Sequence, residues 1–240
     1  MSFFNALNHP VLMQFDLSKT RREVSLLSLI VTLAIIHWIE PSWLVLILLL
    51  CFWGVIFFPW RRVDVLLFSV ASLFFLFQNY AVLKVGGFSF KHQDILLMPY
   101  YEPFLWGFYF VNIKRFFAEP IKTSSLSRKS FIGLFTTMVA FSLFSKQSET
   151  LLIVSSVSTI FLLVLFHQRR DLYYGAYALL LGFVIELFGV STGLWRYPHP
   201  DFLGVPYWFA PMWISVGILA RRFVIPLAEW LDAGIRKRIT

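Results

Sequence analysis

Charged residues are scarce in this chain. Asp, Glu, Lys and Arg together make up 14% of the 240 residues, whereas hydrophobic residues make up 58%, and the mean hydropathy is +0.73. Twenty-eight phenylalanines and an aromatic content of 19% give more apolar surface than the core of one soluble domain of this length can bury. This balance excludes a water-soluble globule and predicts a polytopic protein whose solvent is a lipid bilayer.

Cysteine and cofactor motifs are also scarce. Cys51 is the single cysteine and lies in an apolar run, so an intrachain disulfide and a cysteine metal cluster are both excluded. The sequence has no Gly-rich phosphate loop, no nucleophile elbow and no redox cofactor motif, so we expect no cofactor. The net charge of +8 does not indicate a nucleic-acid partner, because the basic residues stand in short clusters between apolar runs.

Apolar windows between the charge clusters predict eight transmembrane helices, so the expected fold class is all-α. Both termini are expected in the cytoplasm, because 17 of the 21 Lys and Arg residues then face inside, as the positive-inside rule requires. The short window 131–145 leaves seven spans as an alternative, but the charge distribution favours the even number. We expect location in a bacterial inner membrane. The predicted spans lie near 23–39, 42–59, 64–84, 99–116, 131–145, 149–166, 171–192 and 206–228.

The second half of the chain repeats the first at an offset of 107 residues. Between positions 86 and 116 there are nine ungapped identities in 31 positions, where chance gives about two. We therefore predict one membrane domain, 1–240, with internal repeats 17–116 and 124–223. Four spans per unit make the repeats parallel, with a site at their interface near the external side. The identical pairs include Gly86 with Gly193, His92 with His199, Pro99 with Pro206 and Trp106 with Trp213.

Each repeat contains an outward loop with a His-x-Asp motif between a glycine and a Pro-Tyr pair. One interpretation is that the loops are interfacial caps, with their aromatic residues in the belt at the membrane surface. In a second interpretation, two histidines and two carboxylates converge on one metal ion across the pseudo-axis. The spacing alone favours the first, because Asp two residues after His also binds loop amides. We expect no metal site, and the candidates for one are His92, Asp94, His199 and Asp201.

Two carboxylic acids fall within predicted spans. Glu102 stands in the first turn of its span, and Glu186 lies roughly 10 Å inside the external end of its own. An ionisable group at this depth is paired, protonated or placed beside a water-filled cavity. The repeat sets Asn79 opposite Glu186 and Phe209 opposite Glu102, and this asymmetry favours a function. Helix capping by Glu102 and pairing of Glu186 with Asn79, Arg196 or a loop amide is the structural alternative.

The ends of both halves resemble a known family. The segment IELFGVSTGLWRYP with GVPYWFAPMW resembles integral-membrane carotenoid-biosynthesis proteins of the carotenoid hydratase type. The segment NYAVLKVGGFSF with MPYYEPFLWGFYF is similar to the lycopene cyclase domain, which also occurs as two tandem copies. The family's paired Glu-Glu is Tyr101-Glu102 in the first copy and Trp208-Phe209 in the second, so only Glu102 can carry that role. The resemblance implies a divergent member of this superfamily.

The resemblance implies a long apolar isoprenoid or polyene lipid, bound between the halves and cyclised or hydrated after protonation of a double bond. Such chemistry needs a carboxylic acid kept neutral by an apolar site, so Glu102 and Glu186 are the catalytic candidates. Aromatic faces would stabilise the carbocation. The substrate-binding candidates are Asn79, Tyr100, Trp106, Trp195, Tyr197, Tyr207 and Trp208.

Two alternatives stay open. A non-enzymatic lipid-binding or membrane-complex assembly subunit would use the Phe-rich faces and loops as packing surfaces, either as a homo-oligomer or with another membrane protein. A small-solute transporter would also explain repeated halves. The spans contain few polar residues and no broken mid-membrane helix, which speaks against transport.

Overall fold

The computed structural model describes residues 17–117 and 126–239. The predictions for Lys122 and for the first two residues of the second repeat unit lie outside these ranges. In chain order the elements are α1 (Leu17–Trp38), α2 (Ser42–Ile56), α3 (Arg62–Lys84), β1 (Ser89–Phe90), α4 (Glu102–Phe117), α5 (Arg128–Phe144), α6 (Ser148–Phe166), α7 (Arg169–Ser191), β2 (Trp195–Arg196), α8 (Phe209–Leu219), the π-helical turn η1 (Ala220–Val224) and α9 (Ile225–Ile239).

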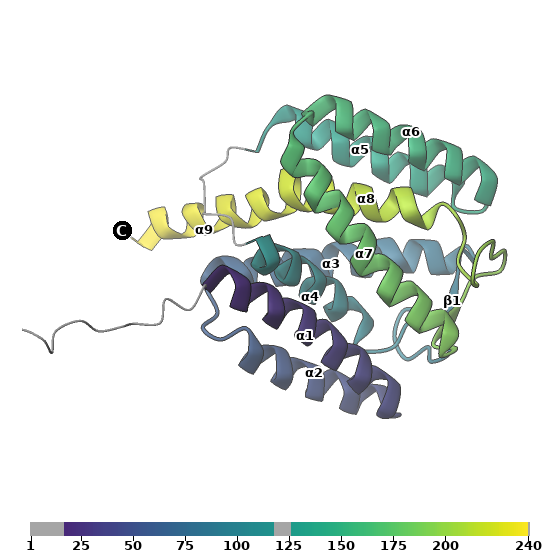
Figure 1. The fold of residues 1–240 in the computed structure, drawn as a ribbon, viewed down its shortest axis with the longest axis horizontal. Coiled ribbons are helices and arrows are strands. Elements are labelled where there is room, and N and C mark those ends of the chain that lie inside the picture. The colour runs from purple at the N-terminus through teal and green to yellow at the C-terminus, as the bar shows by residue number, and fades with distance from the viewer. Residues whose placement is uncertain (1–16, 118–125, 240) are drawn as a thin grey trace, which may run out of the picture.

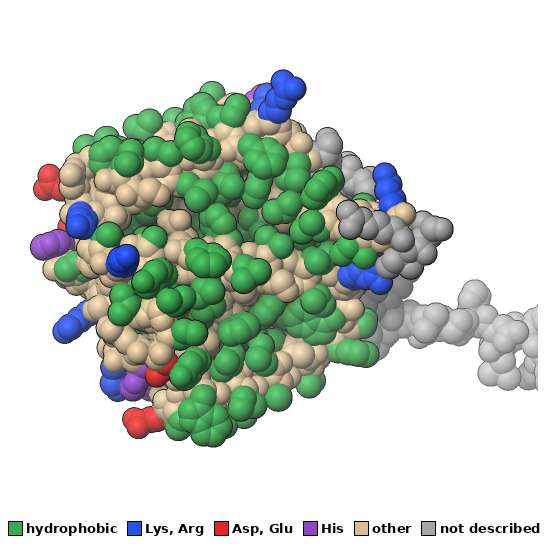
Figure 2. All heavy atoms as spheres, turned by 180° about the vertical axis from the view of Figure 1, so that it is seen from behind, with side chains coloured by type: hydrophobic (Ala, Val, Ile, Leu, Met, Phe, Trp, Pro, Cys, Tyr) green, Lys and Arg blue, Asp and Glu red, His purple; other side chains and the backbone are tan. Residues whose placement is uncertain are grey.

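The protein is an all-α membrane protein, as the composition predicts. All eight predicted windows are helical, including the short one, which is α5. Within the described residues, α3, α6, α7 and the continuous segment Phe209–Lys237 are long and apolar enough to cross a membrane by length and composition, and α2 is a shorter apolar helix. Figure 2 shows a broad hydrophobic surface with the charged side chains gathered towards its two ends, the pattern of a surface that meets lipid.

The helices form two groups. In Figure 1, α1 to α4 lie together on one side of the molecule and α5, α6 and α8 on the other, with α7 crossing in front. Helix α3 packs on α4 in the first group and α7 packs on α8 in the second. The two groups meet where α9 packs on α3 and where α4 contacts α7. The aromatic core therefore continues from one group into the other.

Landmarks in the two groups recur at the predicted offset. Helices α3 and α7 each contain 23 residues and begin 107 positions apart. Just after each helix stands a glycine in the left-handed region, Gly86 with φ 82° and Gly193 with φ 71°, where a side chain would be strained. Near the opposite end of each helix, a buried aspartate pairs with two basic residues of the helix that follows. The pairs are Asp64 with Lys114 and Arg115, and Asp171 with Arg221 and Arg222.

The loops that follow α3 and α7 are joined by a short antiparallel ladder. Strand β1 pairs with β2, and Ser89 stands opposite Arg196, its own partner at an offset of 107. The Arg196 Nε donates to the Ser89 Oγ at 3.3 Å. Direct pairing of equivalent residues is what a twofold axis through the ladder produces. That the units 17–116 and 124–223 superpose as whole bodies stays a prediction.

Candidate functional site

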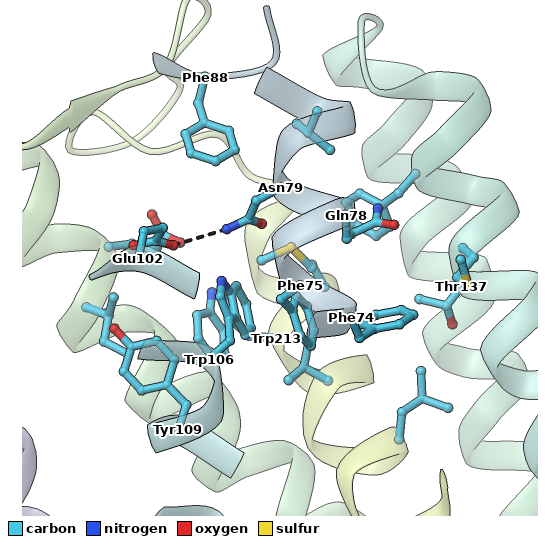
Figure 3. Close-up of a pocket in the computed structure, with 18 of the residues that line it drawn as sticks. Phe74, Phe75, Gln78, Asn79, Phe88, Glu102, Trp106, Tyr109, Thr137 and Trp213 are labelled. Carbon is cyan, nitrogen blue, oxygen red and sulfur yellow. Dashed lines mark hydrogen bonds between the residues drawn. The ribbon is translucent and has the colours of Figure 1, made fainter. Parts of the chain in front are cut away.

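A cavity of about 140 Å³ lies between the two groups of helices, below the strand ladder. Aromatic and aliphatic side chains from α3, α4, α5, α7, α8 and both loops form most of its wall, and Figure 3 shows several of them converging on it. The polar lining is concentrated at its outer part, around Asn79, Glu102 and Glu186. The site is therefore an apolar chamber with a polar end.

Glu102 enters this chamber from the first turn of α4. Its side chain is buried, and its Oε1 accepts a hydrogen bond of 3.1 Å from the Nδ2 of Asn79 on α3 (Figure 3). Pro103 follows in the first helical turn, where its missing N–H costs nothing, so the chain turns into α4 with Glu102 directed inward. The carboxyl group is thus held by a donor from the neighbouring helix.

Glu186 reaches the same chamber from α7 in the other group of helices. It is buried, and its Oε2 accepts hydrogen bonds from the Nε1 of Trp195 at 3.0 Å and from the hydroxyl of Tyr197 at 2.8 Å. Burial and the nearby Glu186 carboxylate raise the pKa of the Tyr197 phenol well above its usual value, so the hydroxyl stays protonated and donates. The two carboxyl groups are close enough for their charges to interact.

The polar end arises from differences between the repeats. The loop of the second repeat supplies the donors Trp195 and Tyr197, whereas the equivalent residues of the first, Phe88 and Phe90, have none. All four rings lie together, with Phe88 and Tyr197 centroids 5.8 Å apart and Phe90 and Trp195 centroids 5.9 Å apart. The site is built across the pseudo-axis, but its hydrogen-bonding groups are not duplicated.

Two stacked tryptophans form the inner boundary of the polar end. Trp106 of α4 and Trp213 of α8, which are repeat equivalents, stack with centroids 5.3 Å apart and an interplanar angle of 15°. Both indole N–H groups are buried and have no hydrogen-bond partner among the described residues. Each nevertheless lies beside a carboxyl group, Trp106 by Glu102 and Trp213 by Glu186, just outside hydrogen-bond geometry.

A buried polar network joins α4 to α1 and α7. The Tyr177 hydroxyl donates to the Oδ1 of Asn112 at 2.7 Å, and the Asn112 Nδ2 donates to the carbonyl of Ser25 on α1 at 2.7 Å. At an offset of 107, Asn112 corresponds to Leu219, which lines the cavity.

The cavity lies next to a lipid-facing surface. Thr137 of α5 and Phe74 and Gln78 of α3 line it and are partly exposed, so we place its opening between these two helices. Beside them, Phe77 on α3 and Phe135 on α5 are 66% and 68% exposed. The opening therefore lies on an apolar face of the molecule.

The structure brings together most, but not all, of the predicted site residues. Tyr100 and Tyr207 are exposed and lie outside the cavity lining, because both precede their helices in the turn and point away. Tyr109 and Trp213 line the cavity but were missed, although the repeat pairing of Trp213 with Trp106 was a signal for it. The roles of the residues stay predictions. The predicted residues that line the chamber are Asn79, Glu102, Trp106, Glu186, Trp195, Tyr197 and Trp208.

The four metal-ligand candidates lie in the exposed loops. Asp94 accepts a hydrogen bond from the Ser42 hydroxyl, and Asp201 accepts one of 2.8 Å from the backbone N–H of Tyr207. Within the described residues, no three His, Cys, Asp or Glu side chains are grouped so that they could hold a metal ion. Asp201 therefore closes its own loop, whereas Asp94 ties its loop to the start of α2.

Solved structures with a similar fold exist. No family model matches the chain, and no curated protein matches it in sequence. Two crystal structures do match: a mycobacterial Insig homologue, MvINS, from Mycobacterium vanbaalenii, with a TM-score of 0.60, and a cross-linked trimer of a cysteine variant of MvINS, with a TM-score of 0.59. Each is 16% identical and covers 69% of this chain and 93% of its own.

These neighbours show that the resemblance to the lycopene cyclase domain and to carotenoid hydratases is wrong. The residues that carried it are glycines, prolines and interfacial aromatics at helix ends. Gly86 and Gly193 end helices in the left-handed region, and Pro99 and Pro206 precede the next helices. Any chain that needs such turns beside a membrane selects these residue types. The fold of this chain is similar to that of the Insig homologue MvINS.

Proposed function

We propose that this protein is a non-enzymatic lipid-binding membrane protein that holds a long apolar molecule in the chamber between its two groups of helices. The single observation that carries the proposal is the apolar chamber itself, which has a polar outer end and an opening towards lipid. Ligand sites of this kind are concave, mostly apolar and marked by a few polar groups that fix orientation. The fold shared with MvINS agrees with a binding protein better than with the cyclisation or hydration expected from the sequence.

The decisive experiment fills the chamber. Thr137→Trp places an indole into the cavity from α5, so lipid that copurifies with the protein should fall severalfold. Mass spectrometry of lipids extracted from the purified full chain measures this loss, and circular dichroism checks the fold.

The adjacent Thr136 offers a matched control. Thr136 and Thr137 both donate their hydroxyl to the Gly133 carbonyl at 3.0 Å, but Thr136 does not line the cavity. Thr136→Trp should therefore retain the bound lipid. If both variants kept the same lipid as the wild type, the chamber would not be its site, and the proposal would fail.

We further infer that the protein forms a homo-oligomer in the bilayer. One of the similar solved structures is a cross-linked trimer, and this chain exposes large apolar side chains over much of its surface (Figure 2). Native mass spectrometry from detergent tests this inference, since a purely monomeric spectrum at all protein concentrations would contradict it.

A further inference from the structure

The two carboxyl groups in the chamber face no basic side chain. The cavity lining contains Glu102 and Glu186 but no Lys, Arg or His among the described residues. Lys114 and Arg115 pair with Asp64, and Arg221 and Arg222 pair with Asp171, at the opposite ends of the helices. Arg196 lies in an exposed loop. A buried carboxylate without a compensating charge is costly, so each of these groups is either protonated or paired with a positive charge that comes from outside the fold.

The protein groups around the carboxyls act as donors. Asn79, Trp195 and Tyr197 donate hydrogen bonds to them, and the unpartnered indole N–H groups of Trp106 and Trp213 lie beside them. Each donor stabilises the ionised carboxylate and so offsets part of the cost that burial imposes on the charge, which prepares the pair to receive a cation. These three bonds use Oε1 of Glu102 and Oε2 of Glu186, so the other oxygen of each carboxyl takes no part in them.

The remaining wall of the polar end is aromatic. Trp106 and Trp213 lie below the carboxyls, and Trp195, Tyr197 and Trp208 lie on the loop side, with the Tyr197 and Trp208 centroids 5.8 Å apart. Aromatic faces attract cations through the ring quadrupole, most strongly when the cation is desolvated. The faces of Trp106 are covered by Phe75 and Trp213, so the rings left to surround a cation beside the carboxylates are those on the loop side. Carboxylates next to such an aromatic wall can hold an ammonium group.

Resting on the proposed lipid-binding function, we propose that the chamber selects an amphiphile with a protonated amine, whose ammonium group lies between Glu102 and Glu186 and whose alkyl tail extends along the apolar wall towards α3 and α5. A primary ammonium group has three N–H donors, enough to reach both carboxylates. Its positive charge compensates the two carboxylates, beside which the cavity lining has no basic side chain among the described residues. The aromatic rings around it require no further polar groups.

The test compares amphiphiles that differ only in the headgroup. The probes are 8-bromooctylamine, 8-bromooctanol and 8-bromooctanoate, because bromine quenches tryptophan fluorescence only at close approach and the tail is constant. The titrations use the purified full chain in a neutral detergent. We expect the amine to bind at least about tenfold more tightly than the alcohol, and the carboxylate most weakly.

The variants Glu102→Gln and Glu186→Gln, made separately, keep the size of the side chain. Each should lower the affinity for the amine to about the affinity for the alcohol. Glu149→Gln at the start of α6, a carboxylate outside the cavity, is the matched control and should leave the preference unchanged. If either Gln variant fails to fold, the ratio of the wild-type affinities for the amine and the alcohol still tests the proposal.

Equal affinities of the wild type for the amine and the alcohol would overturn the ammonium site, and so would a preference that survives both Gln substitutions. Saturable quenching by the alcohol would in those cases leave the lipid-binding function standing. Quenching by none of the three probes would remove the lipid-binding function as well.

Discussion

At the residue scale, the buried Asn112 network is the clearest test of how α4 is held against α1 and α7. Asn112→Leu leaves the buried Tyr177 hydroxyl without its acceptor, whereas the Ser25 carbonyl still accepts from the Ser28 hydroxyl. We expect the free energy of unfolding to fall by about 1–3 kcal/mol, the usual cost of a buried polar group that loses its hydrogen bond. Thermal unfolding in detergent, followed by circular dichroism, measures the loss.

A double-mutant cycle supplies the control. Tyr177→Phe removes the hydroxyl, so Asn112→Leu should cost less in that background than in the wild type. Equal costs in both backgrounds would mean that the network contributes nothing through this bond.

Individual site residues were predictable from the sequence to different degrees. Glu102 and Glu186 stood out because ionisable residues are rare inside apolar spans, and both line the cavity. Tyr100 and Tyr207, which are identical at the offset of 107, are predicted to bind the substrate through their aromatic faces, yet both side chains are exposed and lie outside the cavity lining. Identity between repeats does not indicate which way a side chain points, since that depends on where the helix begins.

At the scale of elements, α7 approaches its neighbours through glycines. An added Cβ at Gly182 would lie 2.3 Å from the Trp213 ring, far inside van der Waals contact. Gly182→Ala should therefore push Trp213 out of its stack with Trp106 and lower the free energy of unfolding by about 1–3 kcal/mol, the range for overpacking. Copurified lipid should fall as well, because both rings line the chamber.

Gly234 of α9 is the matched control for this substitution. A Cβ there meets nothing within 4 Å, so Gly234→Ala should leave the lipid content unchanged and stabilise the helix by roughly 0.5–1 kcal/mol. Equal behaviour of the two alanine variants in thermal unfolding and lipid content would refute the close approach of α7 to Trp213.

The helices themselves were the easiest part to predict. Apolar runs bounded by charge identify spans because an unpaired backbone cannot lie in lipid, so all eight windows are helical. The cavity was not predictable in the same way. Leu219, which stands where the first repeat has Asn112, lines the chamber, and no hydropathy window distinguishes a leucine that lines a chamber from one that fills a core.

At the scale of the whole molecule, the basic clusters predict which end of the bundle faces the cytoplasm. In a background where the exposed Cys51 is replaced by serine, Arg170→Cys should resist a membrane-impermeant maleimide in intact cells, and Lys91→Cys should react. Labelling after lysis controls for accessibility. External labelling at position 170 would reverse the topology and with it the assignment of the polar end to the external side.

The stacked Trp106 and Trp213 come from different halves of the chain, so the overlap of their rings depends on how the two groups of helices are positioned relative to each other. Two parallel indoles 5.3 Å apart couple as electronic transition dipoles, and such coupling gives a paired positive and negative band in circular dichroism. The Trp106–Trp213 pair is therefore an intrinsic spectroscopic probe at the inner boundary of the polar end. An occupant that shifts one half against the other would change this band without any attached dye.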